Sequence, residues 1–472
     1  MKRTKIVATM GPSTAKRDVL KQMFESGVNV CRLNFSHGTH EDHEDIIRMI
    51  RDLNTETGMS VAILADLQGP KIRTGKMTDN GILLEEGNEV KITTKDVLGT
   101  SERFSINYQD LPRDVKPGER LLLDDGKFTL EIVDSNGKDE ITAKIILGGT
   151  LSSRKGVNFP NTKISMPSLT EKDRIDLDFA LLHEVDWIAL SFVRSAVDMR
   201  ELKEIIKKQG KHTKVIAKIE KPEAIQEIDA IIEESNGLMV ARGDLGVEIP
   251  FQNVPLIQKM LIRKCRANAK PVIVATQMME SMMDNTTPSR AEVNDVANAV
   301  FDGTDAVMLS GETSVGKYPV EVIKAMANIA QEIEAYEDLY NKHEPPKKDQ
   351  RRFITDSICF NAVRLCKRVD AKAILTMSFT GYTGYKVASQ RPNANIFVFT
   401  SNRRILTQLN LVWGVKGFYY DKTESTDQTI SDIKNMLKDA GRINSGDLVI
   451  NIASMPIEEH GNSNMLKLSY VD

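Results

Sequence analysis

Eight short apolar runs, each ending in polar residues, constrain the fold of this 472-residue chain more than any other feature. Each run is rich in β-branched or aliphatic residues and is bounded by charge, Gly or Pro, which is typical of a buried parallel strand. Most runs start roughly thirty residues apart, the length of one strand–helix unit. Eight such units close a (β/α)₈ TIM barrel, whose chemistry lies where the strands end. The runs are Lys5–Gly11, Val28–Phe35, Val61–Leu67, Trp187–Phe192, Val215–Glu220, Leu238–Asp244, Pro271–Gln277 and Asp305–Glu312.

An insert with a different pattern of apolar and polar residues follows the third run. It alternates apolar and polar residues over short stretches such as Glu89–Thr94 and Glu140–Leu147, with turn pairs such as Asn136-Gly137 between them. We therefore expect residues 70–167 to form a small all-β lid domain at the active-site end of the barrel. The barrel itself then comprises residues 1–69 and 168–340.

The last part of the chain begins with a linker. Two helical stretches, Val320–Tyr340 and Arg352–Arg368, flank the polar segment Asn341–Arg351, which contains two consecutive prolines. Beyond it, strand-like and helix-like stretches alternate again. We expect residues 341–472 to form a doubly wound α/β domain.

Composition excludes several classes of protein. The net charge of −3 argues against a nucleic-acid-binding protein, and no apolar run is long enough to span a bilayer. The start at Met1 leads directly into the first run, which leaves no room for a signal peptide. The four cysteines lack metal-ligand spacing and suggest buried thiols. We expect a cytoplasmic protein.

Two acidic residues end neighbouring strands. Glu220 follows the fifth strand and Asp244 the sixth, and such a pair of hard oxygen ligands suits Mg²⁺ or Mn²⁺. Lys218 lies two residues before Glu220, so the two side chains project to the same face of the strand. A cation beside a metal-binding acid is useful where negative charge develops. The alternative is an ion pair inside the barrel.

Other strand ends suit an anionic substrate. Arg32, Asn34 and Ser36 alternate along the second strand, and Arg73 follows the third strand closely. Two arginines within reach of one site suit phosphate. Thr276 and Ser310 could orient water or bind a carboxylate, although a hydroxyl there is often only a helix cap.

Several stretches together resemble the pyruvate kinase family. The resemblance covers essentially the whole chain, and it implies the same layout of barrel, β lid and C-terminal α/β domain. It also implies phosphoryl transfer from phosphoenolpyruvate to ADP, which yields ATP and pyruvate in the last step of glycolysis. The stretches are Arg32–Gly38, Ala65–Arg73, Lys155–Pro160, Lys218–Glu220, Met239–Pro250, Ala275–Met283, Arg290–Asn298 and Asp302–Thr313.

The resemblance assigns a role to each matched position. Glu220 and Asp244 match the divalent-metal ligands, and Lys218 matches the lysine that stabilises the transferring phosphoryl group. Arg32 and Arg73 match phosphate-binding arginines. The other implied sites are the substrate carboxylate site at Ala241, Arg242, Gly243, Asp244 and Thr276; the group that positions the protonating water, Thr276, Ser310 and Glu312; and the nucleotide contacts Pro12, Asn34, His37, Arg73 and Lys155.

The chain departs from the family pattern at the monovalent-cation site. Asn34, Ser36 and Asp66 match ligands of that ion, but Leu67 replaces the usual Thr, and Lys71 stands where potassium-dependent members carry Glu. We expect the Lys71 ammonium to replace potassium, so that K⁺ is not required. The alternative is a surface lysine.

The last domain carries a candidate effector site. Thr380, Gly381 and Thr383 lie between a strand and a helix, where hydroxyls and helix N–H groups could hold a phosphorylated effector. An ordinary strand–helix turn is the alternative. The family resemblance also implies a homotetramer.

The sequence leaves two other functions open. A metal-dependent lyase acting on pyruvate enolate would need the acid pair, but not the convergence of Lys218, Arg32 and Arg73 on a phosphate. A non-catalytic regulatory homologue would have lost a metal ligand or the lysine, and this sequence keeps them.

Overall fold

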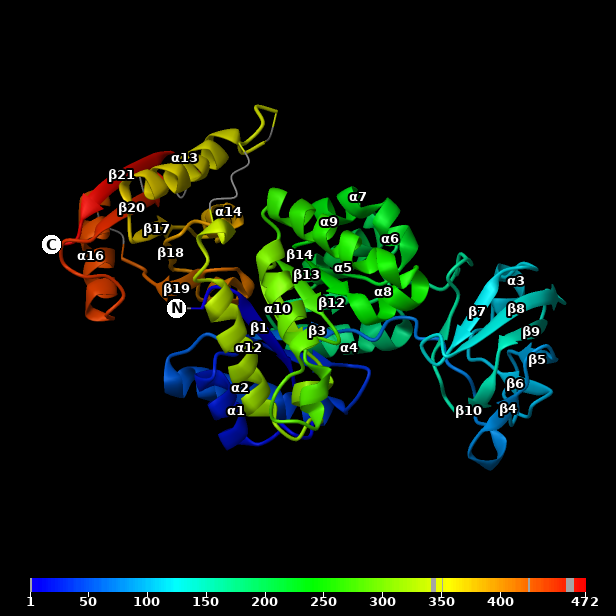
Figure 1. Ribbon diagram of the computed structural model, residues 1–472. Helices are drawn as coiled ribbons and strands as arrows, with labels where there is room; N and C mark the ends of the chain where they lie inside the picture. The colour runs from blue at the N-terminus through cyan, green and yellow to red at the C-terminus, as the bar shows by residue number, and fades with distance from the viewer. Residues whose placement is uncertain (1, 341–344, 350, 423–424, 456–461) are drawn as a thin grey trace.

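The eight predicted runs form one closed, all-parallel barrel in the computed structural model (Figure 1). The structure describes residues 2–340, 345–349, 351–422, 425–455 and 462–472. The strand order around the barrel is β1-β16-β15-β14-β13-β12-β3-β2, so each strand neighbours the next in sequence and the predicted fold is confirmed. The strands are β1 (Lys5–Thr9), β2 (Val30–Asn34), β3 (Ala62–Asp66), β12 (Trp187–Leu190), β13 (Lys214–Ile219), β14 (Gly237–Ala241), β15 (Val272–Ala275) and β16 (Ala306–Leu309).

Helices surround the barrel, and local sequence sets where several of them begin. Thr39, Thr170 and Ser289 each precede a helix and accept a hydrogen bond from the backbone N–H three residues later, while the acid at that position bonds back. This reciprocal capping satisfies N–H groups that the first helical turn leaves unpaired. The helices are α1 (Arg17–Glu25), α2 (His40–Thr57), α4 (Glu171–Leu182), α5 (Ala196–Lys208), α6 (Pro222–Gln226), α7 (Ile228–Glu234), α8 (Arg242–Glu248), α9 (Val254–Ala267), α10 (Arg290–Asp302), α11 (Gly311–Ser314) and α12 (Pro319–Ile333).

The barrel is packed rather than hollow. One set of alternating strand side chains, including Leu64, Trp187, Ile216 and Met239, fills its interior, while the other set packs under the helices. Leu411 of the C-terminal domain belongs to the interior cluster. The amino-terminal mouth of the barrel is therefore closed by a residue from a different domain.

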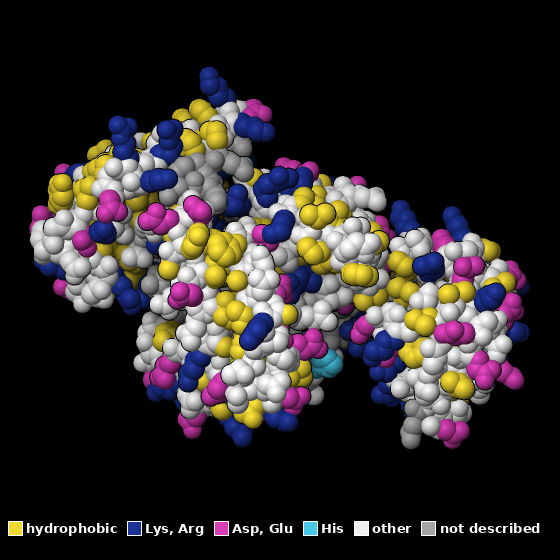
Figure 2. All heavy atoms as spheres, in the orientation of Figure 1, with side chains coloured by type: hydrophobic (Ala, Val, Ile, Leu, Met, Phe, Trp, Pro, Cys, Tyr) yellow, Lys and Arg dark blue, Asp and Glu magenta, His cyan; other side chains and the backbone are white. Residues whose placement is uncertain are grey.

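The lid emerges after β3, at the opposite end of the barrel. It contains a six-stranded sheet of order β11-β7-β8-β9-β5-β6 and a two-stranded sheet, β10-β4. It stands away from the barrel, and an open hollow separates the lower part of the lid from the barrel (Figure 2). Its elements are β4 (Ile82–Leu84), β5 (Glu89–Thr93), β6 (Arg103–Ser105), α3 (Leu111–Asp114), β7 (Arg120–Leu123), β8 (Phe128–Ser135), β9 (Glu140–Leu147), β10 (Gly149–Leu151) and β11 (Val157–Asn158).

The C-terminal domain is a five-stranded sheet covered by helices. Its order is β19-β18-β17-β20-β21, parallel except for β21, which pairs antiparallel at one edge. Of the predicted linker, residues 341–344 and 350 lie outside the described residues. The elements are α13 (Phe353–Val369), β17 (Ala373–Met377), α14 (Tyr382–Ser389), β18 (Asn395–Thr400), α15 (Arg403–Gln408), β19 (Val415–Tyr419), α16 (Thr426–Asp439), β20 (Leu448–Ala453) and β21 (Met465–Tyr470).

Polar contacts hold this domain against the amino-terminal ends of the barrel strands. The Lys5 ammonium donates to the Val415 carbonyl at 2.8 Å, and Arg391 pairs with Asp305 at 3.2 Å. No helix among the described residues combines the length and apolar character needed to cross a membrane.

Candidate active site

A buried carboxylate, Asp66, organises the rim of the barrel where β2, β3 and β13 end. Its side chain is 1% exposed. Arg32 binds one of its oxygens at 2.6 Å, and the Lys218 ammonium lies 3.1 Å from the other. Burial alone would raise the pKa of Asp66, but Lys218 and Arg32 outweigh it and hold the pKa below its usual range. Asp66 thus fixes both cations in place.

Lys218 serves two carboxylates at once. Besides Asp66, its ammonium contacts Glu220 at 2.9 Å and donates to the Ser191 hydroxyl at 2.6 Å. Burial opposes its charge, yet Asp66 and Glu220 outweigh burial and raise the pKa of Lys218. The side chain is therefore a fixed cation rather than a proton donor near neutral pH.

Glu220 and Asp244 form an acidic pair suited to a divalent cation. Burial raises the pKa of Glu220, and the charge of Asp244 raises it further, against the opposing effect of Lys218. Neighbouring carboxylates that repel each other favour a cation between them. Among the described residues, no group of three or more His, Cys, Asp or Glu side chains is arranged to hold a metal. The protein therefore offers two carboxylates, and substrate oxygens and water would complete the shell.

The turn after β14 presents backbone N–H groups at the same rim. Helix α8 begins directly at Arg242, whose guanidinium is held away by Asp295 at 2.7 Å and by the Thr276 carbonyl at 2.7 Å. The Gly243 N–H donates to the Thr276 hydroxyl at 2.8 Å. Arg242 thus acts through its backbone, and Thr276 lies beside the turn.

Both carboxylate oxygens of Glu312 accept hydrogen bonds from backbone N–H groups. One of its oxygens accepts the Met279 N–H at 3.1 Å and the other accepts the Ser310 N–H at 2.7 Å. It therefore ties the end of β16 to the loop after β15, and Ser310 is positioned through its backbone.

A group of cations faces the second and third strand ends. Burial lowers the pKa of His37, and the positive charges of Lys71, Arg73 and Arg32 lower it further. The four side chains are thus close enough to interact, as a phosphate-rich ligand would require. Lys155 lies apart from them, paired with Asp124 of the lid at 3.1 Å, and Pro12 is exposed beyond the end of β1.

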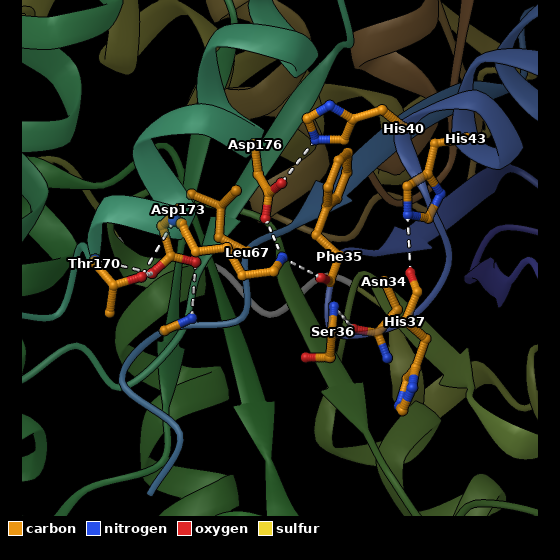
Figure 3. Close-up of polar contacts among 12 residues, drawn as sticks. Asn34, Phe35, Ser36, His37, His40, His43, Leu67, Thr170, Asp173 and Asp176 are labelled. Atoms are coloured by element: carbon orange, nitrogen blue, oxygen red, sulfur yellow. Dashed lines mark hydrogen bonds and ion pairs between the residues drawn. The ribbon is translucent and has the colours of Figure 1, made fainter. Parts of the chain in front are cut away.

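Three of the residues expected to bind a monovalent cation, Asn34, Ser36 and Leu67, are drawn in Figure 3. Asn34 accepts the Ser36 N–H at 3.2 Å, and both side chains are half-buried. Asp66 is already occupied by Arg32 and Lys218. The Leu67 side chain is apolar and buried, and its carbonyl accepts from Ser191 at 2.7 Å. Lys71 is exposed.

Two residues that contribute to the site are not among those predicted from the sequence. Ser191 directly follows β12, and its hydroxyl accepts from Lys218. Asp295 lies on α10 and holds Arg242. The position of Ser191 at a strand end could have identified it, whereas an acid on a surrounding helix carries no such signal.

The candidate effector residues border a separate cavity of about 320 Å³ in the C-terminal domain. Thr380 and Thr383 line it, and Gly381 adopts a left-handed conformation that begins α14. The Thr383 hydroxyl lies 2.9 Å from that of Ser463. Arg352, stacked 4.2 Å from the centre of the Tyr382 ring, supplies a positive charge to the same cavity.

Comparison with known proteins gives a consistent family. Residues 1–323 match the family described as pyruvate kinase, barrel domain, and residues 356–469 match pyruvate kinase, alpha/beta domain. The chain is 45% identical to a pyruvate kinase of Geobacillus stearothermophilus over 476 residues, which covers 100% of this chain and 80% of the relative. It is 44% identical to a pyruvate kinase of Corynebacterium glutamicum, covering 98% of this chain and 97% of the relative. A crystal structure of a pyruvate kinase from Cryptosporidium parvum superposes with a TM-score of 0.93 at 35% identity, covering 100% of this chain and 96% of that one.

Proposed function

The chain belongs to the pyruvate kinase family and transfers the phosphoryl group of phosphoenolpyruvate to ADP, giving pyruvate and ATP, and on this basis we propose a role for each site residue. Phosphoryl transfer depends on positioning and charge neutralisation more than on covalent help. The assignment of roles rests on one observation: the Lys218 ammonium contacts Asp66, Glu220 and Ser191 at the same time.

Lys218 and Arg32 neutralise the transferring phosphoryl group. Both are fixed by Asp66, so little reorganisation is needed as charge develops on the phosphoryl oxygens. Arg73 adds a second guanidinium from the lid side, where its backbone N–H donates to Asn107 at 2.7 Å. Two guanidinium groups can grip phosphate oxygens in a fixed orientation.

Glu220 and Asp244 hold the divalent metal, Mg²⁺ or Mn²⁺. When bound, such an ion neutralises phosphate charge and polarises an enolate oxygen. With the metal bound, Glu220 contributes a charged oxygen ligand and also accepts the Phe192 N–H at 2.8 Å, which orients it.

The turn Ala241–Gly243 binds the substrate carboxylate. Its backbone N–H groups open helix α8, and the Gly243 N–H, which donates to the Thr276 hydroxyl in this structure, would turn to the carboxylate with Thr276 beside it. Thr276 and Ser310 then orient the water that protonates the enolate, while Glu312 holds Ser310 in place.

The nucleotide lies on the cationic side of the rim. Asn34, His37 and Arg73 contact it from the barrel and the start of the lid, with Pro12 nearby. Lys155 reaches it from the lid, which requires the hollow between the lid and the barrel to narrow (Figure 2).

Other features of the enzyme follow from the same proposal. The Lys71 ammonium replaces potassium beside Asn34, Ser36, Asp66 and the carbonyl of Leu67. A phosphorylated effector binds at Thr380, Gly381 and Thr383 with help from Arg352. The enzyme is a cytoplasmic homotetramer, and its buried free thiols fit a reducing compartment.

Glu220→Gln tests the assignment at the metal site. The substitution keeps the shape of the side chain and removes a charged ligand, so we expect turnover of phosphoenolpyruvate and ADP to fall by about a hundredfold or more. Mn²⁺ affinity, followed by electron paramagnetic resonance, should fall in parallel. Glu227→Gln changes an exposed acid further along the chain and should affect neither. Wild-type turnover of Glu220→Gln at limiting Mg²⁺ would refute the metal role.

A further inference from the structure

A large cavity lies between the amino-terminal end of the barrel and the C-terminal domain. It has a volume of about 700 Å³ and is bordered by α5, the start of β13, α15 and the turn at Phe379 and Thr380. We call it the interdomain cavity. Its two acidic lining residues are Glu204 and Glu234, and its six cationic ones are Arg200, Lys203, Lys207, Lys211, Lys214 and Arg404.

Half of these cations have a carboxylate partner. Glu234 is shared by Lys203 at 3.1 Å and Arg200 at 3.8 Å. Lys211 lies 3.5 Å from Glu184.

The other three cations of the cavity have no carboxylate partner among the described residues. Within the described part of the chain, the side chains of Lys207, Lys214 and Arg404 make no ion pair or hydrogen bond. The cavity wall therefore carries three cations without an ion-pair partner, against one lining acid, Glu204, that has none either among the described residues.

Lys214 is the least exposed of these three. It is the first residue of β13 and is half-buried. Burial lowers the pKa of its ammonium, and the positive charge of Lys203 lowers it further, with no carboxylate opposing them. A partly desolvated cation without a counter-charge is unfavourable, and a bound anion would relieve that cost.

We propose that the interdomain cavity binds a small phosphate-bearing polyanion. Its volume lies in the range of small-molecule sites. The Arg404 guanidinium can grip two phosphate oxygens, while Lys207 and Lys214 supply compact charges. The site is at the opposite end of the barrel from Lys218 and Glu220, so its ligand is not the reacting substrate.

The position of this site allows it to affect the C-terminal domain. Phe379 and Thr380 border both the interdomain cavity and the candidate effector cavity. Asn402, the residue that caps α15, donates to the Phe379 carbonyl at 3.3 Å, and Gln408 at the end of α15 donates to the His212 carbonyl at 3.4 Å, so the capped helix contacts both the shared turn and the barrel. A polyanion held between Lys214 and Arg404 would link the two domains and stabilise the whole chain by mass action.

Calorimetric titration with inorganic pyrophosphate, in EDTA and at constant ionic strength, tests the proposal on the full-length protein. A charge-assisted hydrogen bond to phosphate contributes a factor of about ten to the binding affinity. We expect Arg404→Gln to weaken binding of pyrophosphate to one class of sites by that factor, and Lys214→Met to weaken it as much. Arg404 is exposed, so its replacement should not disturb folding.

Two matched variants distinguish a built site from diffuse attraction to a basic surface and from binding in the effector cavity. Lys208→Gln removes an exposed charge next to Lys207 on the same helix but outside the interdomain cavity, and Arg352→Gln removes a charge from the effector cavity. Both should keep the pyrophosphate site that Arg404→Gln weakens. Wild-type affinity and stoichiometry in Arg404→Gln would overturn the proposal. Equal weakening in Lys208→Gln would also overturn it, because the attraction would then be diffuse.

Discussion

At the scale of single residues, the role proposed for Lys218 separates phosphoryl transfer from the enolisation of pyruvate. Its ammonium is held by Asp66 and Glu220, and we propose that it faces the phosphoryl group rather than a proton-transfer partner. Lys218→Met should therefore reduce phosphoryl transfer by about a hundredfold or more, while metal-assisted enolisation of pyruvate is spared. The two activities are measured by a coupled assay and by exchange of the methyl hydrogens of pyruvate with deuterium. Similar losses in both would show that Lys218 is structural or a proton carrier.

The response to potassium tests the role proposed for Lys71. The positive charge of Lys71 lowers the pKa of the His37 imidazole, so it reaches the residues that follow β2. We expect the unmodified enzyme to need no added K⁺ and Lys71→Glu to need it, because the substitution turns a tethered cation into an anion. Activity is titrated against K⁺, with tetramethylammonium keeping the ionic strength constant.

Lys76→Glu makes the same charge change at another exposed lysine of the segment that enters the lid, and it should leave the K⁺ response unchanged. A large rise in the activity of the unmodified enzyme on adding K⁺ would show that Lys71 does not replace the ion.

At the scale of elements, the sequence locates strands better than it locates their ends. The run Leu238–Asp244 reads as one strand, but β14 ends at Ala241 and α8 starts at Arg242. The predicted helix Val320–Tyr340 is wrong in its last third, because α12 ends at Ile333. Glu334 there turns to accept the backbone N–H groups of Arg3 and Thr4 at 2.6 and 2.5 Å. Such a contact between distant segments leaves no periodic pattern in the sequence from which the end of the helix could be predicted.

Glu312 connects two elements, and its replacement should cost stability as well as activity. In Glu312→Gln, one backbone N–H, of either Met279 or Ser310, would face an amide NH₂ instead of an oxygen. A buried donor left unpaired costs about 1–3 kcal/mol, so we expect a lower Tm in calorimetry. The exposed Glu321→Gln of α12 is the control. An unchanged Tm with reduced turnover would indicate that Glu312 acts only on the catalytic water.

At the scale of the whole molecule, strand-end chemistry is predictable from the sequence and contacts between domains are not. Lys218, Glu220 and Asp66 follow from their places at the ends of parallel strands, since a closed barrel brings those ends together. The plugging of the barrel mouth by Leu411 depends on how two separately folded bodies dock. No local pattern encodes that docking, so the interdomain cavity could not be predicted either.

We expect Asp186 to make this docking sensitive to pH. It precedes β12, accepts the Ile63 N–H at 2.8 Å and accepts a hydrogen bond from Thr407 of α15. Burial raises the pKa of Asp186 to about 6, although Thr407, the Ile63 N–H and Arg51 act in the opposite direction. Because the pKa is raised on folding, the folded state favours the protonated acid. The resulting stabilisation is complete below the unfolded pKa of about 4 and is lost as the pH rises through about 6.

Asp186→Asn should remove this pH dependence. The amide can accept from the Ile63 N–H through its oxygen and donate to the Thr407 hydroxyl through its nitrogen, so the contact between domains survives without a group that ionises. Relative to the wild type, we expect the variant to gain about 2 kcal/mol of stability between pH 4.5 and 7.5. Thermal unfolding across that range measures the difference, and Asp439→Asn, at an exposed position of α16, should reproduce the wild-type profile. Parallel profiles for the wild type and Asp186→Asn would mean that Asp186 is ionised throughout the range and that another group governs any pH dependence of the interface.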